Sequence, residues 1–198
     1  NHLLLPPASS MHGEQIDALM QFTMGLILVA FFLLTPILFY FAYKYRGRKD
    51  NRAYYYPHNN KLELIWTVVP TIILTGVIIY GLKTWDSVMN VDTSDAHEIE
   101  VYSKQFQWLA REAGEDKVLG ASNFKLIDAT NNLGVDMEDP NSLDDKVVRE
   151  VHLVVDKPVL LKFRSQDVIH SAFLPHFRVQ MNCVPGLSTQ FAFTPTQT

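Results

Sequence analysis

The residue types best suited to binding a metal are concentrated in one stretch near the end of the sequence, from Gln166 to Gly186. It contains imidazole, thioether and thiol groups, all of which soft metals accept as ligands. The residues are His170, His176, Met181 and Cys183. Each residue type also occurs as an ordinary packing or surface residue, and a lone cysteine is more often a small core side chain. Which of the four residues can bind a metal therefore depends on the elements that position this stretch.

Two apolar segments precede this stretch, and residues 19–43 and 64–82 carry no charged side chain. About 20 apolar residues suffice for a helix to cross a bilayer. Internal prolines, here Pro36 and Pro70, are tolerated in membrane helices when neighbouring groups satisfy the freed carbonyls. The pattern predicts a helical hairpin with membrane spans at about residues 19–43 and 63–83.

The predicted loop between the spans, residues 44–61, is strongly basic. Its charged side chains are Lys44, Arg46, Arg48, Lys49, Arg52 and Lys61, against the single acid Asp50. An excess of Lys and Arg is typical of cytoplasmic loops, so both ends of the hairpin are expected to face outward. Tyrosines near the first exit and Trp85 at the second suit the aromatic belts at membrane interfaces.

After Trp85 the composition becomes that of a soluble β domain, rich in β-branched residues and turn signals. We predict a small antiparallel sandwich with four main strands and one short strand. These are His97–Lys104, Val148–Val155, Val159–Phe163 and Leu187–Thr194, with the short strand at Phe124–Ile127. The predicted division is an N-terminal outer segment 1–17, a membrane hairpin 18–85 and an outward-facing domain 86–198.

Charge and cysteine content narrow the possible partners. From Asp86 onward the sequence has 17 acidic and 10 basic side chains, a formal balance of −7. This balance disfavours nucleic acid and allows either a solvated acidic face or electrostatic steering of a basic protein. Because Cys183 is the only cysteine, no intramolecular disulfide can form within these residues.

Three motifs occur in a fixed order around these elements. They are Lys61–Leu74 at the start of the second span, Gln105–Trp108 early in the β domain, and Gln166–Ser171 followed by Val184–Gly186. In this order the chain resembles subunit II of the bacterial haem-copper cytochrome c oxidases. The resemblance runs from the first span to the last residue and includes the insert 126–140.

This resemblance implies a cupredoxin-like sandwich, a dinuclear copper A centre and transfer of electrons from cytochrome c to the haems of subunit I. It places His170 at the first histidine ligand of the copper pair. The other ligands in the family are two cysteines, a histidine and a methionine in a later segment, together with one backbone carbonyl. We expect that segment after Thr198, so that the printed sequence is truncated. The resemblance gives His176, Met181 and Cys183 no ligand role.

Two further positions match functional residues of the family. Trp108 matches the aromatic residue at which electrons enter, with a buried sandwich tryptophan as the alternative. Glu63 matches the glutamate at the mouth of a proton pathway, and it also suits the first turn of a helix. Where the family often has Asp beside a metal bridge to subunit I, this chain has Asn182, which leaves a carboxylate role there in doubt.

The expected function is that of the electron-entry subunit of a proton-pumping terminal oxidase in a bacterial inner membrane, with its outer domain in the periplasm. The expected partners are subunit I, other oxidase subunits, membrane lipid, and cytochrome c or a c-type haem domain. One alternative is a quinol oxidase subunit II without copper. Another is a membrane-tethered β-sandwich with a purely structural role.

Overall fold

The computed structural model describes residues 5–49, 52 and 54–197. Asp50 of the predicted basic loop lies outside these residues, as do residues 1–4 of the predicted N-terminal segment. The chain forms two compact units. One comprises residues 15–85, and the other combines the residues before Gln15 with those from Asp86 onward.

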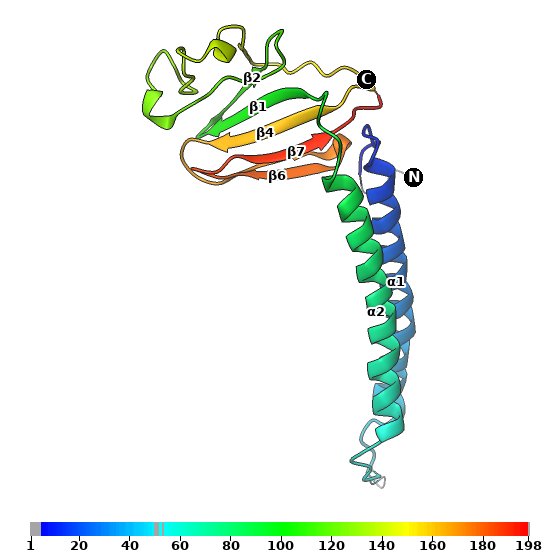
Figure 1. The fold of residues 1–198 in the computed structure, drawn as a ribbon. Helices are drawn as coiled ribbons and strands as arrows, with labels where there is room; N and C mark the ends of the chain where they lie inside the picture. Colours follow the sequence, from blue (N-terminus) through cyan, green and yellow to red (C-terminus); the bar gives the residue numbers. More distant parts are fainter. Residues whose placement is uncertain (1–4, 50–51, 53, 198) are drawn as a thin grey trace. The chain divides into compact units, whose positions relative to one another are not determined.

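The first unit is built from two long apolar helices that run side by side, α1 (Gly13–Lys44) and α2 (Asn60–Met89) (Figure 1). Both are long and apolar enough to cross a membrane, and they contain the predicted spans. The rings of Phe22 and Tyr80 meet edge to face at 5.8 Å between centroids, which joins the two helices. The predicted helical hairpin is therefore confirmed.

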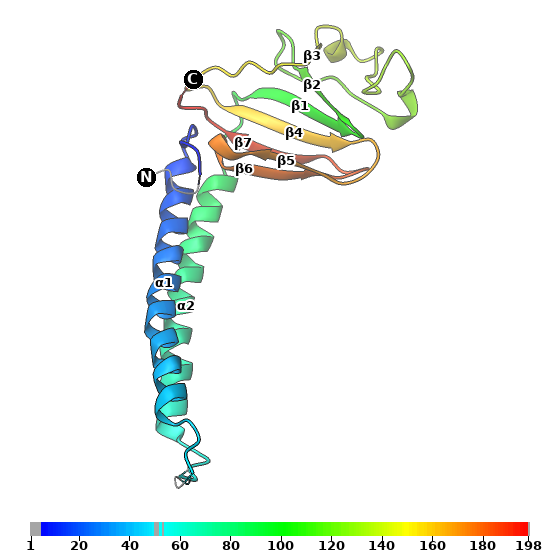
Figure 2. The ribbon, with the colours of Figure 1, turned by 180° about the vertical axis from the view of Figure 1, so that it is seen from behind.

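The second unit contains two β-sheets. The larger has the strand order β3-β2-β1-β4-β7, and the smaller pairs β5 with β6. The strands are β1 (His97–Lys104), β2 (Gln107–Glu112), β3 (Lys146–Val148), β4 (Val159–Ser165), β5 (His170–Leu174), β6 (Val179–Cys183) and β7 (Thr189–Phe193). The β5–β6 pair lies along one face of the larger sheet in both Figure 1 and Figure 2.

The core of this unit lies between the two sheets. Alternate residues of the larger sheet turn inward, so that Ile99, Phe163 and Phe193 are fully buried. From the smaller sheet, Val179 and Cys183 are equally buried. The predicted two-sheet β domain is confirmed, and β6 of the smaller sheet packs against β4 and β7 of the larger one.

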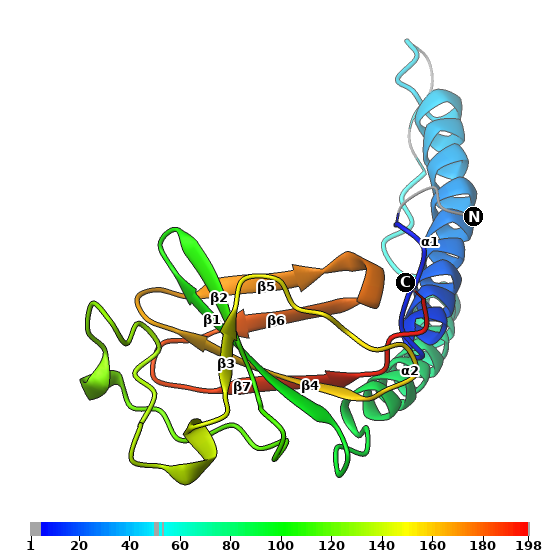
Figure 3. The same cartoon turned by 90° about the horizontal axis from the view of Figure 1, so that it is seen from above.

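A long insert, residues 113–145, lies beside β1 and β2 at one end of the larger sheet (Figure 1, Figure 3). Tyr102 of β1 is buried there with Leu133 and Val135 of the insert, and Leu109 and Ile127 pack around them. The insert therefore buries the second face of the larger sheet at β1 and β2.

The prediction of an antiparallel sandwich was wrong for one strand pair. β1 and β4 pair in parallel, with His97 opposite Val159. Parallel strands need a long crossover connection, and the chain between them supplies one through β2, the insert and β3.

Two of the predicted strands were also wrong. Only Lys146–Val148 forms a strand where Val148–Val155 was expected, because this edge strand finds ladder partners on β2 for just three residues. The segment Phe124–Leu126 is a 3-10 helix, since the Asn123 side chain accepts a hydrogen bond from the Lys125 backbone N–H and closes a turn instead.

The N-terminal residues before α1 form an arm against the last strand region of the same unit. The Ser9 N–H donates to the His176 carbonyl at 2.7 Å, and the Thr196 N–H donates to the Ser9 carbonyl at 2.8 Å. His12 is buried edge-on against the Phe191 ring, and this burial lowers the pKa of His12. The two ends of the described chain are thus hydrogen-bonded to one another.

Candidate functional site

His170 is the first residue of β5 and lies opposite Cys183 of β6. Its side chain is 17% exposed, and its Nε2 lies 2.7 Å from Oδ1 of Asp167. The loop 166–169 that links β4 to β5 brings this carboxylate back onto the ring. His170 is therefore held at the edge of the core with one ring nitrogen bonded.

The Asp167 carboxylate fixes which nitrogen of His170 carries a proton. Hydrogen bonds from the His170 ring and from the Gln105 backbone N–H hold the pKa of Asp167 well below its ordinary value. An ionised carboxylate can only accept hydrogen bonds, so His170 Nε2 must be the donor. In the neutral ring the Nδ1 lone pair is then left to bind a metal, an arrangement typical of metal-ligating histidines.

Trp108, near the start of β2, lies next to this histidine. The two rings meet edge to face with their centroids 5.9 Å apart and their planes at 73°. Trp108 is 48% exposed as a residue, so it contacts His170 and also faces solvent. The structure thus brings together two residues that are 62 positions apart in the sequence.

The other candidate ligands of the stretch lie in different surroundings. Cys183 is fully buried, and this burial raises the pKa of its thiol. Met181 is half-buried opposite Ala172, and His176 is exposed in the 3-10 helix beyond the far end of β5. Asn182 is exposed, and its carbonyl accepts a hydrogen bond from the Thr189 hydroxyl at 2.6 Å.

Metal binding by these residues alone is limited. Among residues 5–49, 52 and 54–197, no group of three or more His, Cys, Asp or Glu side chains could hold a metal ion. His170 fits the role of one ligand, because Nδ1 is the nitrogen that Asp167 leaves unprotonated. A dinuclear copper centre would need its other ligands from residues outside this set.

Glu63 belongs to the membrane hairpin and takes part in capping α2. The Asn59 side chain accepts from the Leu62 N–H at 3.0 Å, and Glu63 Oε1 lies 3.4 Å from the Asn59 N–H. Such reciprocal bonds satisfy N–H groups that have no partner within the helix. Glu63 is exposed within its unit, so this capping role leaves its carboxylate accessible.

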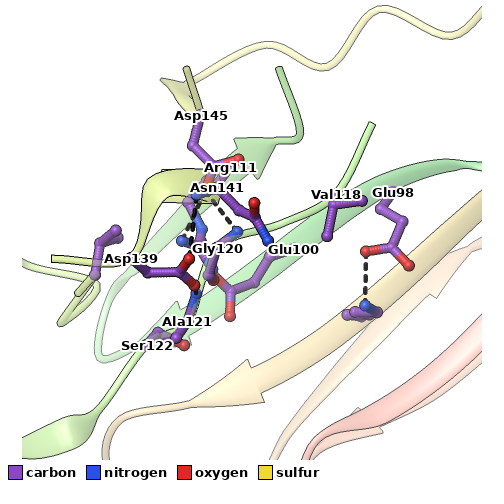
Figure 4. Close-up of polar contacts among 12 residues, drawn as sticks. Glu98, Glu100, Arg111, Val118, Gly120, Ala121, Ser122, Asp139, Asn141 and Asp145 are labelled. Atoms are coloured by element: carbon purple, nitrogen blue, oxygen red, sulfur yellow. Dashed lines mark hydrogen bonds and ion pairs between the residues drawn. The ribbon is translucent and has the colours of Figure 1, made fainter. Parts of the chain in front are cut away.

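Sequence reasoning missed a buried ion network between the larger sheet and the insert (Figure 4). Arg111 of β2 bonds Glu100 of β1 at 2.9 Å and Asp145 of the insert at 3.0 Å, and all three side chains are less than 5% exposed. Glu100 also accepts from Arg164 of β4 at 2.6 Å. The only available signal was a glutamate inside a half-buried strand, which does not identify its partners.

Comparisons with known proteins agree with this architecture. The family model for the transmembrane domain of cytochrome c oxidase subunit II matches residues 1–84. An alternative cytochrome c oxidase subunit 2 from Bradyrhizobium diazoefficiens is 34% identical over 84% of this chain and 62% of its own length. Cytochrome c oxidase subunit 2 from Synechocystis is 24% identical over the whole chain and 66% of its own length.

Among solved structures, the periplasmic domain of subunit II of cytochrome oxidase from Bradyrhizobium japonicum is 20% identical, with a TM-score of 0.32. That match covers 53% of this chain and 67% of the solved chain. The chain spans roughly two thirds of the length of its relatives. The chain combines two apolar helices, each long enough to span a membrane, with a β domain. It is a homologue of cytochrome c oxidase subunit II.

Proposed function

We propose that this chain is the electron-entry subunit of a respiratory terminal oxidase, which takes electrons from cytochrome c and passes them to the haems of subunit I. Oxygen reduction in subunit I would be coupled to proton pumping. The two helices would anchor the chain in a bacterial inner membrane, with the β domain in the periplasm. Its partners would be subunit I, the other oxidase subunits, membrane lipid, and cytochrome c or a c-type haem domain.

The observation that carries this proposal is the contact between Trp108 and His170. A half-exposed indole packs on an imidazole whose Nε2 is bonded to Asp167. A purely structural tryptophan would be expected to bury its ring in the core. Here a solvent-facing aromatic ring lies directly beside a potential metal ligand, as an electron-entry point requires.

A bound dinuclear copper A centre would supply a one-electron carrier whose charge is shared between two metals, which keeps reorganisation small. His170 would contribute one ligand through Nδ1. We propose that the two cysteines, second histidine and methionine come from residues beyond the 198 printed here.

The acidic balance of the β domain supports a basic electron donor. With 17 acidic and 10 basic side chains from Asp86 onward, the domain would attract a positively charged protein at long range. Such steering mainly raises the association rate, which suits a donor that must bind and leave at every turnover.

Glu63 would serve at the mouth of a proton pathway into subunit I. The six basic residues of the loop 44–61 support a cytoplasmic location for this end of α2, by the positive-inside rule. The cap that Glu63 forms with Asn59 would hold its carboxylate at the start of the helix. Both roles are compatible.

A quinol oxidase subunit II is the second candidate, because it would share the architecture without needing copper. The Trp108–His170 contact favours the copper-containing form. A membrane-tethered sandwich with no electron transfer would leave the bonding of His170 to Asp167 without a functional reason.

Metal analysis and near-infrared absorption of the purified complex test this proposal. We expect two coppers per copy of this chain, and His170→Asn should remove them. His176→Asn is the matched control, since this exposed histidine lies beyond the far end of β5 and should leave copper unchanged. A wild-type complex without copper, or equal copper loss in both variants, would refute the assignment.

A further inference from the structure

We propose that Asp167 is a positioning residue that holds the tip of the β1–β2 hairpin, and with it Trp108, against the His170 ring. The inference rests on the proposed function, because it assigns to one carboxylate the geometry between the electron-entry residue and the copper ligand.

Asp167 accepts hydrogen bonds through both of its carboxylate oxygens. Its Oδ1 accepts from His170 Nε2 and from the Val168 backbone N–H, both at 2.7 Å. Its Oδ2 accepts from the Gln105 backbone N–H, also at 2.7 Å. Two of these donors belong to the loop and strand that carry Asp167, whereas Gln105 is 62 residues earlier in the sequence.

Gln105 belongs to the tip of the β1–β2 hairpin, between Lys104 and Gln107. Trp108 follows three residues later, on a strand that has just begun. A second bond ties the same hairpin to the same loop, because the Gln166 N–H donates to the Ser103 carbonyl at 3.0 Å. The loop 166–169 is therefore hydrogen-bonded to the hairpin at two points, the end of β1 and the tip.

Apolar packing does not hold this tip in place. Phe106 is 97% exposed, so its ring adds almost no buried area. Within unpacked segments, hydrogen bonds decide which conformation is populated. The bond from Gln105 to Asp167 is charge-assisted, a class of hydrogen bond that is roughly twice as strong as one between neutral groups.

The chemistry of a carboxylate suits this role better than that of an amide. Both oxygens of Asp167 accept, so the carboxylate can bond the His170 N–H and the Gln105 N–H together. An asparagine has the same shape, but one of its two ends donates. It would either lose the bond to Gln105 or donate to His170 Nε2 and move the ring proton to Nδ1. The first outcome releases the hairpin, and the second blocks the ligand nitrogen.

Asp167→Asn in the complete oxidase complex tests the inference, with Asp95→Asn as its matched control. Asp95 precedes β1, at the opposite end of that strand from Gln105, and pairs with Lys117 on the surface. The two variants change the domain charge equally, so a general effect on donor attraction would appear in both.

Three measurements separate positioning from mere folding. Hydrogen exchange of the 104–108 segment should quicken about 10-fold in Asp167→Asn. Loss of copper to excess chelator should be at least about 10-fold faster, the usual effect of removing a partner of a metal-bound histidine. The near-infrared band should shift in position. Asp95→Asn should match wild type in all three.

The two proposals can fail separately. If wild type contains copper and Asp167→Asn matches it in exchange, copper loss and spectrum, the positioning role is wrong while the proposed function stands. If wild type contains no copper, the proposed function fails. Exchange at Gln105 then decides whether Asp167 clamps the hairpin, and an unchanged rate overturns the clamp.

Discussion

Replacing Arg111 by Met should detach the insert 113–145 from the larger sheet. Arg111 donates to Glu100 at 2.9 Å, to Asp145 at 3.0 Å and to the Gly120 carbonyl at 3.0 Å, all in buried surroundings. Methionine keeps the apolar packing of the side chain but removes every one of these bonds.

The size of the stability loss depends on which hydrogen bonds Glu100 and Asp145 keep when Arg111 is replaced. Removing one member of a buried ion pair costs about 3–5 kcal/mol, because the other charge stays buried. Glu100 keeps its bond to Arg164, whereas Asp145 keeps only the Gly120 N–H. We therefore expect the lower end of that range, a loss of about 3 kcal/mol in the free energy of opening of the insert.

Hydrogen exchange of the full-length protein in detergent measures this free energy segment by segment. A loss of about 3 kcal/mol predicts that amides such as Gly120 and Ala121 exchange about 100-fold faster. Lys117→Met is the control, because its pair with Asp95 is exposed to solvent and contributes little to stability.

The pH dependence gives a second check. Burial raises the pKa of Asp145 above its ordinary value, so folding favours the protonated form, and the stability associated with this group falls as pH rises through that interval. Without Arg111 the pKa of Asp145 should rise further. The loss in the free energy of opening of the insert, relative to wild type, should then be larger at pH 7.5 than at pH 5. A deficit below about 1 kcal/mol at pH 7.5, or one that grows on acidification, would refute the structural role of the network.

Three further outcomes follow from the structure. Trp108→Ala should slow electron entry from cytochrome c by at least about 10-fold in stopped-flow measurements while copper content is unchanged, and an unchanged rate would remove Trp108 from the pathway. Glu63→Gln should lower the proton-to-electron ratio of the reconstituted complex while α2 stays intact, because glutamine retains the cap; an unchanged ratio would leave Glu63 with the capping role alone. Cys183 should resist maleimide in the native protein and react once unfolded, since burial both shields the thiol and raises its pKa; rapid native labelling would contradict its place in the core.

The membrane hairpin and three of the four main strands, which are β1, β4 and β7, could be predicted because their signals are local. An uncharged run long enough to span a bilayer identifies α1 and α2 without knowledge of neighbours. The same holds for β1, whose alternation is visible within eight residues. The parallel pairing of β1 with β4 was missed because it depends on where the chain returns after more than fifty residues.

In the candidate site, too, features with a local sequence signal were predicted and those that depend on distant residues were not. His170 and Trp108 were identified from the motifs around them, but their mutual contact was not, since it depends on strand register and on the hairpin tip. Asp167 lies inside the Gln166–Ser171 motif but was not identified as a site residue. Its bond to the β1–β2 hairpin comes from the backbone N–H of Gln105. Backbone donors carry no signal in a sequence, so a side chain that bonds one cannot be recognised from residue types.

The N-terminal arm is synthesised long before the residues near the end of the described chain to which it bonds. The Ala8 carbonyl accepts from the Gln197 side chain across 189 positions. At about 5–20 residues per second, the ribosome needs about 10–40 s to complete that interval. During this time the arm has left the ribosome but has nothing to bond, so its polar backbone must stay in water. Closure of the arm would therefore mark the moment at which β7 has reached the same side of the membrane as the arm.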